Sequence, residues 1–169
     1  MDNRSVSIAL FGRSGSGKSF VADRFCQNYG YSLISTGVIC RRICNEVFGE
    51  ESKTSLNILS TKLREIDEDI WIHAAMRNAT QDSLIIFDSI RYLSDYKYFR
   101  RNNFCIVKIE SDPSLVVKRL EERGQIMSDD DRAHPSEWEV EQQDFDFTIM
   151  NDGVDISSID KQIKVLFAQ

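Results

Sequence analysis

The chain has 169 residues, of which 41% are hydrophobic and 28% are charged, and its formal net charge is -6. This length and composition predict one globular domain over residues 1–169. The acidic balance argues against non-specific binding to polynucleotides, and no apolar run approaches the roughly 20 residues of a membrane-spanning helix.

The cysteines and histidines form no pattern that indicates a metal site or a disulfide framework. The four cysteines contain no C-x-x-C pair, and both histidines stand apart from them. Reduced, structural thiols are therefore expected, and they suit a protein of the cytoplasm.

Short apolar runs alternate with longer amphipathic runs along the chain. The alternation predicts βαβ units and a parallel sheet, because a helix must return the chain to the same edge before each new strand. The runs that predict buried strands are 5–11, 31–35, 83–88, 104–110 and 146–150.

Helical patterns fill the spaces between these runs. The stretch 36–80 contains no strand signal, and Asp67 is an N-cap candidate within it. A second start signal is Asp112-Pro113, with proline in the first turn of the helix that follows. Further helices are expected over 17–29 and 92–102, in a short segment from Ser136, and in a last segment that ends near Phe167.

The loop after the first strand carries the clearest functional motif. Residues 12–19 fit G-x-x-x-x-G-K-[ST], a pattern whose glycines let successive N–H groups point at a polyphosphate. The helix that follows directs its positive end at the same anion. Lys18 would reach the β- and γ-phosphates, and the Ser19 hydroxyl would bind Mg²⁺. We therefore expect ATP and Mg²⁺ as cofactors, bound by Gly12, Arg13, Ser14, Gly15, Ser16, Gly17, Lys18 and Ser19.

The segment after the second strand, LISTGVICRR (33–42), resembles the acceptor-binding segment of adenylate kinases and other nucleoside monophosphate kinases. In that family a Thr-Gly pair precedes an arginine that binds the acceptor's phosphate, which here gives Thr36, Gly37 and Arg41. We expect Thr36 to cap a helix and Arg41 to present its guanidinium fork to a phosphate. The alternative is that Arg41 is a surface residue of an amphipathic helix.

The third predicted strand leads into IIFDSIRYLSDYKYFRR (85–101). Asp88 is expected to end this strand beside the phosphate-loop strand, where such aspartates bind Mg²⁺ directly or through water. The Asp-x-x-Arg spacing resembles an element of phage-type deoxynucleoside monophosphate kinases, and this resemblance implies that Arg91 contacts the acceptor or the transferred phosphate. The alternative is a helix-capping aspartate followed by a surface arginine.

Two later segments extend the resemblance. VVKRLEERGQ (116–125) is similar to the start of the lid in nucleoside monophosphate kinases, which implies catalytic roles for Arg119 and Arg123 and a short lid over 124–135. The alternative is a solvated helix face with intrahelical ion pairs to Glu121 and Glu122. The segment 133–153 is similar to phage-type deoxynucleoside monophosphate kinases and to animal-type phosphomevalonate kinases. That likeness places Asn151 and Gly153 near the adenine of ATP.

The resemblance implies a single α/β domain with the three-layer P-loop kinase fold. Its five-stranded parallel sheet would have the order 2-3-1-4-5, and a helical insertion over 36–80 would be the acceptor-binding region. The expected reaction is Mg·ATP-dependent phosphoryl transfer to a small phosphorylated acceptor, a deoxynucleoside or nucleoside monophosphate, by a monomer or homodimer. Lys18, Asp88, Arg91, Arg119 and Arg123 would be catalytic.

Other functions share parts of this pattern. Phosphomevalonate kinase and dephospho-CoA kinase would use the same motifs, and a non-catalytic regulator would bind ATP without transferring phosphate. The missing N-K-x-D motif, and the missing D-x-x-G after the third strand, argue against a switch GTPase or a motor. The negative charge argues against a polynucleotide end kinase.

Overall fold

The computed structural model describes residues 6–168 except 78, 80–83, 125–137 and 154. Its strands are β1 (Ile8–Phe11), β2 (Ser32–Ile34), β3 (Ile85–Ile90), β4 (Cys105–Glu110) and β5 (Phe147–Met150). Its helices are α1 (Lys18–Tyr29), α2 (Thr36–Phe48), α3 (Lys53–Arg64), α4 (Ile70–Met76), α5 (Leu93–Arg101), α6 (Pro113–Glu122) and α9 (Ile156–Phe167).

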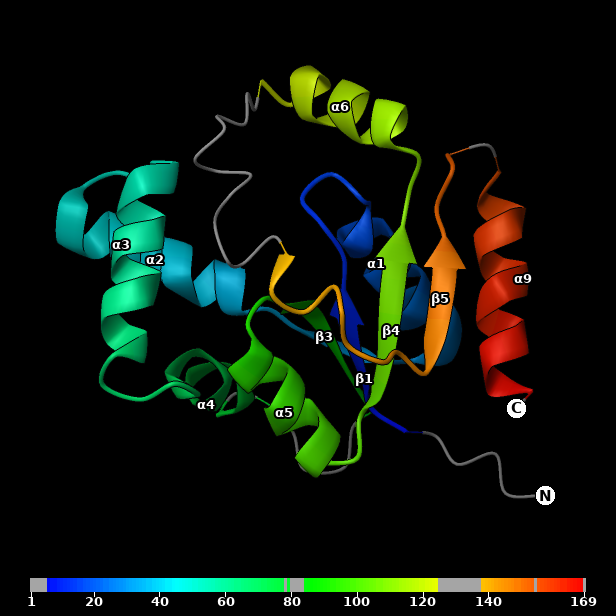
Figure 1. Cartoon of the computed structure of the whole chain (residues 1–169), viewed down its shortest axis with the longest axis horizontal. Helices are drawn as coiled ribbons and strands as arrows, with labels where there is room; N and C mark the ends of the chain where they lie inside the picture. Colours follow the sequence, from blue (N-terminus) through cyan, green and yellow to red (C-terminus); the bar gives the residue numbers. More distant parts are fainter. Residues whose placement is uncertain (1–5, 78, 80–83, 125–137, 154, 169) are drawn as a thin grey trace.

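The strands form one parallel sheet in the order β2-β3-β1-β4-β5, which confirms the predicted topology (Figure 1). The central strand β1 pairs with β3 on one side and β4 on the other, so Ile8 lies opposite both Ile86 and Cys105. The loop after β1 therefore leaves the middle of the sheet, at the edge where the carboxyl ends of neighbouring strands meet. This edge is where ligands bind in open parallel sheets.

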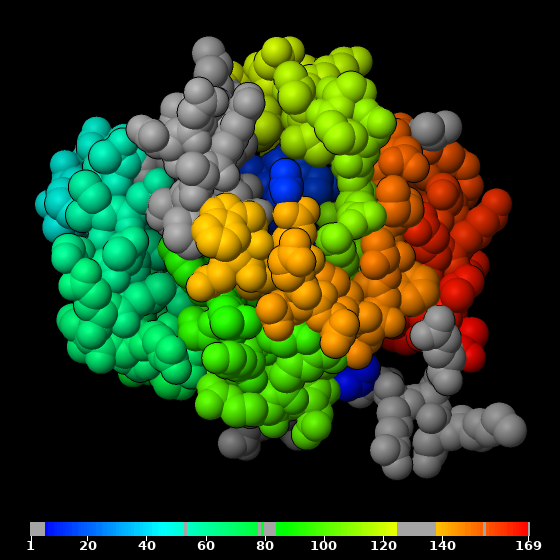
Figure 2. Space-filling view, viewed as in Figure 1, coloured from blue at the N-terminus to red at the C-terminus, as the bar shows by residue number. Residues whose placement is uncertain are grey.

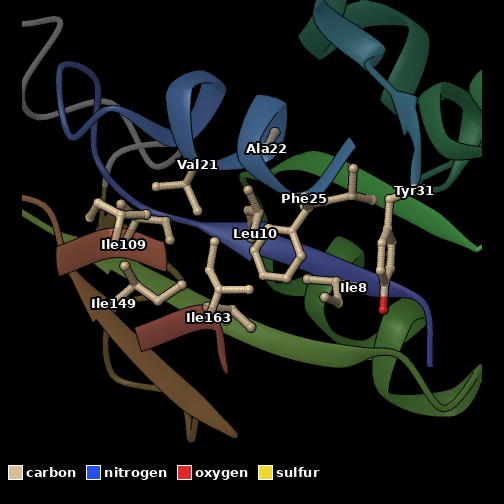
Figure 3. Packing of buried hydrophobic residues seen from close by; sticks show 12 residues of the cluster. Ile8, Leu10, Val21, Ala22, Phe25, Tyr31, Ile109, Ile149 and Ile163 are labelled. Atoms are coloured by element: carbon tan, nitrogen blue, oxygen red, sulfur yellow. The ribbon is translucent and has the colours of Figure 1, made fainter. Parts of the chain in front are cut away.

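Helices cover both faces of the sheet, because alternate residues of the buried strands point to opposite sides. On one face, Ile8 and Leu10 pack with α1 and α9, through residues such as Phe25 and Ile163 (Figure 3). On the other face, Ala9 and Phe11 pack with α4 and α5. The three-layer architecture expected from the sequence is confirmed.

The long region between β2 and β3 folds into the helices α2, α3 and α4. Figure 1 shows α2 and α3 on the side of the molecule opposite β5 and α9. Trp71 and Ile72 of α4 are buried, and the Trp71 indole N–H donates to Ser60 O of α3 at 3.2 Å. These helices thus pack together as a unit at one end of the sheet. Apart from Gly124, the predicted lid lies outside the described residues, and so do Ser136 and the start of the short helix expected there.

Three local predictions need correction. Asp88 does not end its strand, because β3 continues to Ile90, whose side chain is 1% exposed and which lies opposite Phe11. Thr36 is the first residue of α2, and Ser35 occupies the N-cap position. Asp67 accepts a hydrogen bond from the backbone N–H of Asp69, and it is Asp69 that stands at the N-cap position of α4.

Within the part of the chain that the structure describes, no helix is both long and apolar enough to span a bilayer. The four cysteines are free thiols, as the sequence predicted.

Tyr31 makes the stability of the fold sensitive to alkaline pH. Its side chain is 5% exposed, its hydroxyl donates to Val6 O at 2.8 Å, and burial raises its pKa from 10.0 to about 12. Between these values the unfolded chain loses the phenol proton while the folded chain keeps it, so the free energy of unfolding should fall as the pH rises. Burial also raises the pKa of Cys105 to about 11, which acts in the same direction.

Urea unfolding at several pH values above 9 would test this expectation, with Tyr31→Phe as the comparison. The variant should lose less stability than the wild type over the same pH interval. Parallel curves for the two proteins would contradict the assignment of this dependence to Tyr31.

Candidate active site

The phosphate loop connects β1 to α1 and depends on its glycines. Gly15 and Gly17 have φ values of 83° and 86°, in the left-handed region that side chains disfavour. A β-carbon on Gly17 would lie 2.0 Å from Asn151 Nδ2, and one on Gly12 would lie 2.7 Å from Ile109 O. The loop therefore requires glycine at each of these positions, both for its curl and for its close packing against β4 and β5.

One carbonyl of the loop is held by three side chains from the second half of the sequence. Ser16 O accepts hydrogen bonds from Asn151 Nδ2 at 2.9 Å, Ser111 Oγ at 3.0 Å and Arg119 Nη1 at 3.4 Å. Asn151 is 4% exposed, so this arrangement is shielded from water. Because the C=O and N–H groups of a trans peptide point in opposite directions, holding Ser16 O also fixes the direction of the Gly17 N–H group, just before α1.

Lys18 lies at the first position of α1, where the helix begins. Its ammonium folds back over the loop and donates to Gly12 O and, at 3.0 Å, to Arg13 O. It also lies near enough to Asp88 to favour the ionised carboxylate. Ser19, the next residue, is exposed. The Lys18 ammonium, which was predicted to reach the phosphates of ATP, is thus held at the mouth of the loop.

Asp88 lies on β3, beside the phosphate-loop strand. Burial raises the pKa of its carboxyl group, while the Ser35 hydroxyl and the charges of Arg91, Lys18 and Arg41 act against this rise. Its Oδ1 atom is buried and has no hydrogen-bond partner among the described residues. A buried carboxylate oxygen of this kind, next to a phosphate loop, fits a Mg²⁺ ligand, since Mg²⁺ prefers oxygen ligands and binds through one or two carboxylates.

The acceptor-side residues predicted from the sequence meet at the same edge. Arg41 lies one turn after Gly37 on α2, and a β-carbon at Gly37 would lie 3.4 Å from its Nη2 atom. Arg91 follows β3 directly, and its side chain is exposed. The positive charges of both guanidinium groups act to lower the pKa of the Asp88 carboxyl group. Arg41 and Arg91 therefore lie near Asp88, at the carboxyl end of β3.

A cavity of about 390 Å³ opens on the other side of the phosphate loop. Figure 2 shows a hollow between yellow-green α6 and the gold segment after residue 137, with dark blue atoms of the N-terminal region at its bottom. None of the described residues that line the cavity of about 390 Å³ belongs to that gold segment. Apolar groups of Phe20, Ile156 and Ile159 share the cavity wall with the predicted site residues. Those lining residues are Gly17, Arg119, Arg123, Asn151 and Gly153.

Sequence reasoning missed a second polar cluster, on the acceptor side. Asp95 of α5 is 2% exposed and forms an ion pair of 2.9 Å with Arg64 of α3. The Arg64 guanidinium also lies over the ring of Tyr92, with 4.2 Å between its Cζ atom and the ring centroid. Arg64 and Asp95 are 31 residues apart in the sequence, and neither belongs to a motif, so no sequence signal would have paired them.

The segment that follows residue 137 contacts both sides of the site. Glu139 Oε2 accepts a hydrogen bond from Leu93 N at 3.0 Å, and Glu141 forms an ion pair with Arg13 of the phosphate loop. Val140, between them, is fully buried against the sheet. None of these three residues was predicted from the sequence to belong to the site, because their neighbours are distant in the chain.

Comparison with known structures shows the same architecture in several proteins. TT1252 from Thermus thermophilus matches with a TM-score of 0.62 at 18% identity, over 96% of this chain and 96% of that chain. Shikimate kinase from Bacteroides thetaiotaomicron gives 0.61 at 16% identity, over 95% of each chain. Deoxyadenosine kinase from M. mycoides with bound dCTP gives 0.56 at 16% identity, over 96% and 100% of the two chains.

At these identities the likeness shows the fold, which is that of the P-loop kinases. No curated protein matches the sequence significantly. A family model described as an AAA domain, AAA_18, matches residues 8–144, which is more than half of the sequence. The chain therefore belongs to this AAA domain family.

Proposed function

We propose that the protein is a small-molecule kinase that transfers the γ-phosphoryl group of Mg·ATP to an acceptor that already carries a phosphate. The acceptor we favour is a deoxynucleoside or nucleoside monophosphate, which would become the diphosphate. One observation carries the proposal: the carboxylate of Asp88 lies within the electrostatic reach of Lys18 on the donor side and of Arg41 and Arg91 on the acceptor side.

The donor side fits a nucleoside triphosphate. The phosphate loop and the start of α1 would bind the phosphates, with Lys18 on the β- and γ-phosphates. The cavity of about 390 Å³ adjoins Gly17, where the loop meets α1, and it would hold the nucleoside. Its apolar wall and its planar cations suit a base, since guanidinium groups stack on aromatic rings. Arg119 and Arg123 would lie beside the phosphates or base, with Asn151 and Gly153 at the cavity edge.

Mg²⁺, when bound, would neutralise charge on the β- and γ-oxygens, and Ser19 and Asp88 are the residues that would hold it. This chain's own contribution is positioning and electrostatic stabilisation. An ionised oxygen of the acceptor phosphate forms a bond to the γ-phosphorus while the bond to the β–γ bridging oxygen breaks, and ADP leaves. The attacking oxygen carries no proton, so no general base is needed.

The acceptor side favours a phosphorylated substrate. Arg41 and Arg91 present two guanidinium groups from different elements, and such groups bind phosphate in a bidentate manner. Thr36 and Gly37 would lie beside the acceptor at the start of α2. The similar structures include kinases named for shikimate and for deoxyadenosine, which supports a small-molecule acceptor but does not name it.

A coupled ADP-release assay with Mg·ATP would test the proposal. The acceptor panel would contain the common deoxynucleoside and nucleoside monophosphates, phosphomevalonate and dephospho-CoA, with deoxyadenosine, shikimate and gluconate as acceptors that carry no phosphate. We expect turnover with one of the phosphorylated acceptors. Turnover confined to the unphosphorylated group would contradict the acceptor assignment, and ATP binding without any turnover would favour a regulator.

A further inference from the structure

The turn that carries Arg91, between β3 and α5, is held by a carboxylate of α5. Asp95 Oδ2 accepts hydrogen bonds from the backbone N–H groups of Arg91, at 2.9 Å, and Tyr92, at 3.0 Å. The next N–H group, of Leu93, donates to Glu139. The N–H groups of these three successive residues, which lead into α5, are thus occupied by carboxylates of the chain itself. They are not available to an acceptor phosphate, so Arg91 would bind that phosphate through its side chain and not through its own backbone N–H.

The other oxygen of Asp95 connects this turn to the acceptor-side helices. Asp95 Oδ1 lies 2.9 Å from Arg64 Nη1, and the two side chains are 3% and 14% exposed. Arg64 ends α3, and its Nη1 also donates to Glu68 O at 2.7 Å, in the connection to α4. One carboxylate therefore links the end of β3 to the α3–α4 connection.

We propose that Asp95 is a positioning residue for acceptor binding. Its Oδ2 atom fixes the backbone from which Arg91 projects, and its pair with Arg64 fixes that turn relative to α3. The inference rests on the proposed function, because the contact that Asp95 would set is the one between Arg91 and the acceptor phosphate. Neither Asp95 nor Arg64 is required to touch a substrate.

The burial of the pair explains why it would hold one geometry. Removing one partner of a buried ion pair leaves an uncompensated charge, which is strongly destabilising. Arg64 Nε and Asp95 Oδ1 are both buried without a hydrogen-bond partner among the described residues, so the pair is an electrostatic contact at 2.9 Å between two buried charges. The stacking of Arg64 on Tyr92 restricts the guanidinium plane further. The turn therefore has little freedom to present Arg91 elsewhere.

The kinetic test compares Asp95→Ala with Asp160→Ala. Asp160 is the matched control, because it pairs with Arg24 at 2.6 Å between α9 and α1, away from the acceptor residues. For Asp95→Ala we expect the KM of the acceptor to rise about tenfold or more, while the KM of ATP stays within about twofold. Asp160→Ala should leave both values near those of the wild type.

A double variant separates positioning from general loss of structure. Arg64→Gln combined with Asp95→Asn leaves no buried charge, while the new amide oxygen can still accept the hydrogen bonds of the turn. We expect it to recover an acceptor KM within about threefold of the wild type. It also serves as the test protein if Asp95→Ala does not fold, in which case an acceptor KM raised tenfold in the double variant would overturn the inference.

Amide hydrogen exchange provides a readout that does not depend on turnover. The N–H groups of Arg91 and Tyr92 should exchange faster in Asp95→Ala and remain protected in Asp160→Ala. Unchanged exchange at these positions, or equal rises in the KM of acceptor and ATP, would overturn the inference. If the wild type transfers phosphate to no phosphorylated acceptor, the proposed function fails, and the exchange result alone decides whether Asp95 holds the turn.

Discussion

Replacement of Lys18 by alanine should abolish phosphoryl transfer, with kcat lowered by about 10³-fold or more. A preorganised cation that stabilises the charge on a transferring phosphoryl group acts mainly in the transition state, and removing one such group costs several kcal/mol of transition-state stabilisation. The fold should survive, because the Lys18 ammonium contacts the backbone carbonyls of Gly12 and Arg13 at the partly exposed mouth of the loop.

The Lys18→Ala measurement needs three readouts: the rate of ADP release with the best acceptor, the affinity for ATP, and the thermal midpoint. Lys164→Ala is a suitable control, since Lys164 is an exposed lysine in the last turn of α9. Normal turnover in Lys18→Ala would refute the kinase proposal.

Replacement of Asp88 by asparagine should make the protein less active and more stable. Burial raises the pKa of Asp88, which means that the fold disfavours the charged carboxylate relative to the unfolded chain. Asparagine carries no charge at neutral pH, so burying it avoids the unfavourable desolvation of a carboxylate. The thermal midpoint without Mg²⁺ should therefore rise. Activity should fall by about 10²-fold or more, because the amide would hold Mg²⁺ poorly at the donor phosphates. A functional site that lowers the stability of the fold is a common trade-off.

Thermal unfolding with a chelator, and kcat measured across a range of Mg²⁺ concentrations, would check both parts of the Asp88 prediction. Asp23→Asn removes an exposed carboxylate from α1 and controls for the change in net charge. A lower thermal midpoint for Asp88→Asn would contradict the account of burial. An unchanged kcat at every Mg²⁺ concentration would contradict the role in metal binding.

The parts of the molecule that could be predicted from sequence are those whose cause is local. The phosphate loop could be predicted because its conformation needs glycine at fixed positions. The left-handed φ values of Gly15 and Gly17 show that need directly. Strand positions followed from short apolar runs. The ends of the strands were predicted less accurately, and β3 is an example. Ser89 interrupts the apolar pattern of this strand, but its side chain is buried and the strand continues to Ile90.

Contacts between distant segments could not be predicted, because nothing in the local sequence encodes them. From the sequence, Asp95 is an ordinary polar residue of a predicted helix. Its contact with Arg64 exists only because the fold brings the end of α3 close to α5. The resemblance predicted Asn151 near the adenine, and that placement stays a prediction. Its hydrogen bond to Ser16 O of the phosphate loop had no sequence signal. The arginines predicted at the acceptor side do meet at one sheet edge, yet their contact with a substrate remains a proposal.

The three hydrogen bonds to Ser16 O have a consequence for the folding of the protein during its synthesis. The phosphate-loop motif is complete by residue 19. The hydrogen bonds to Ser16 O also require Ser111, Arg119 and Asn151, and Asn151 directly follows the edge strand β5. A nascent chain that stops before β5 therefore carries the whole nucleotide-binding signature without the support that shapes it. We therefore expect the phosphate loop to reach its final shape late in translation, after the last strand has joined the sheet.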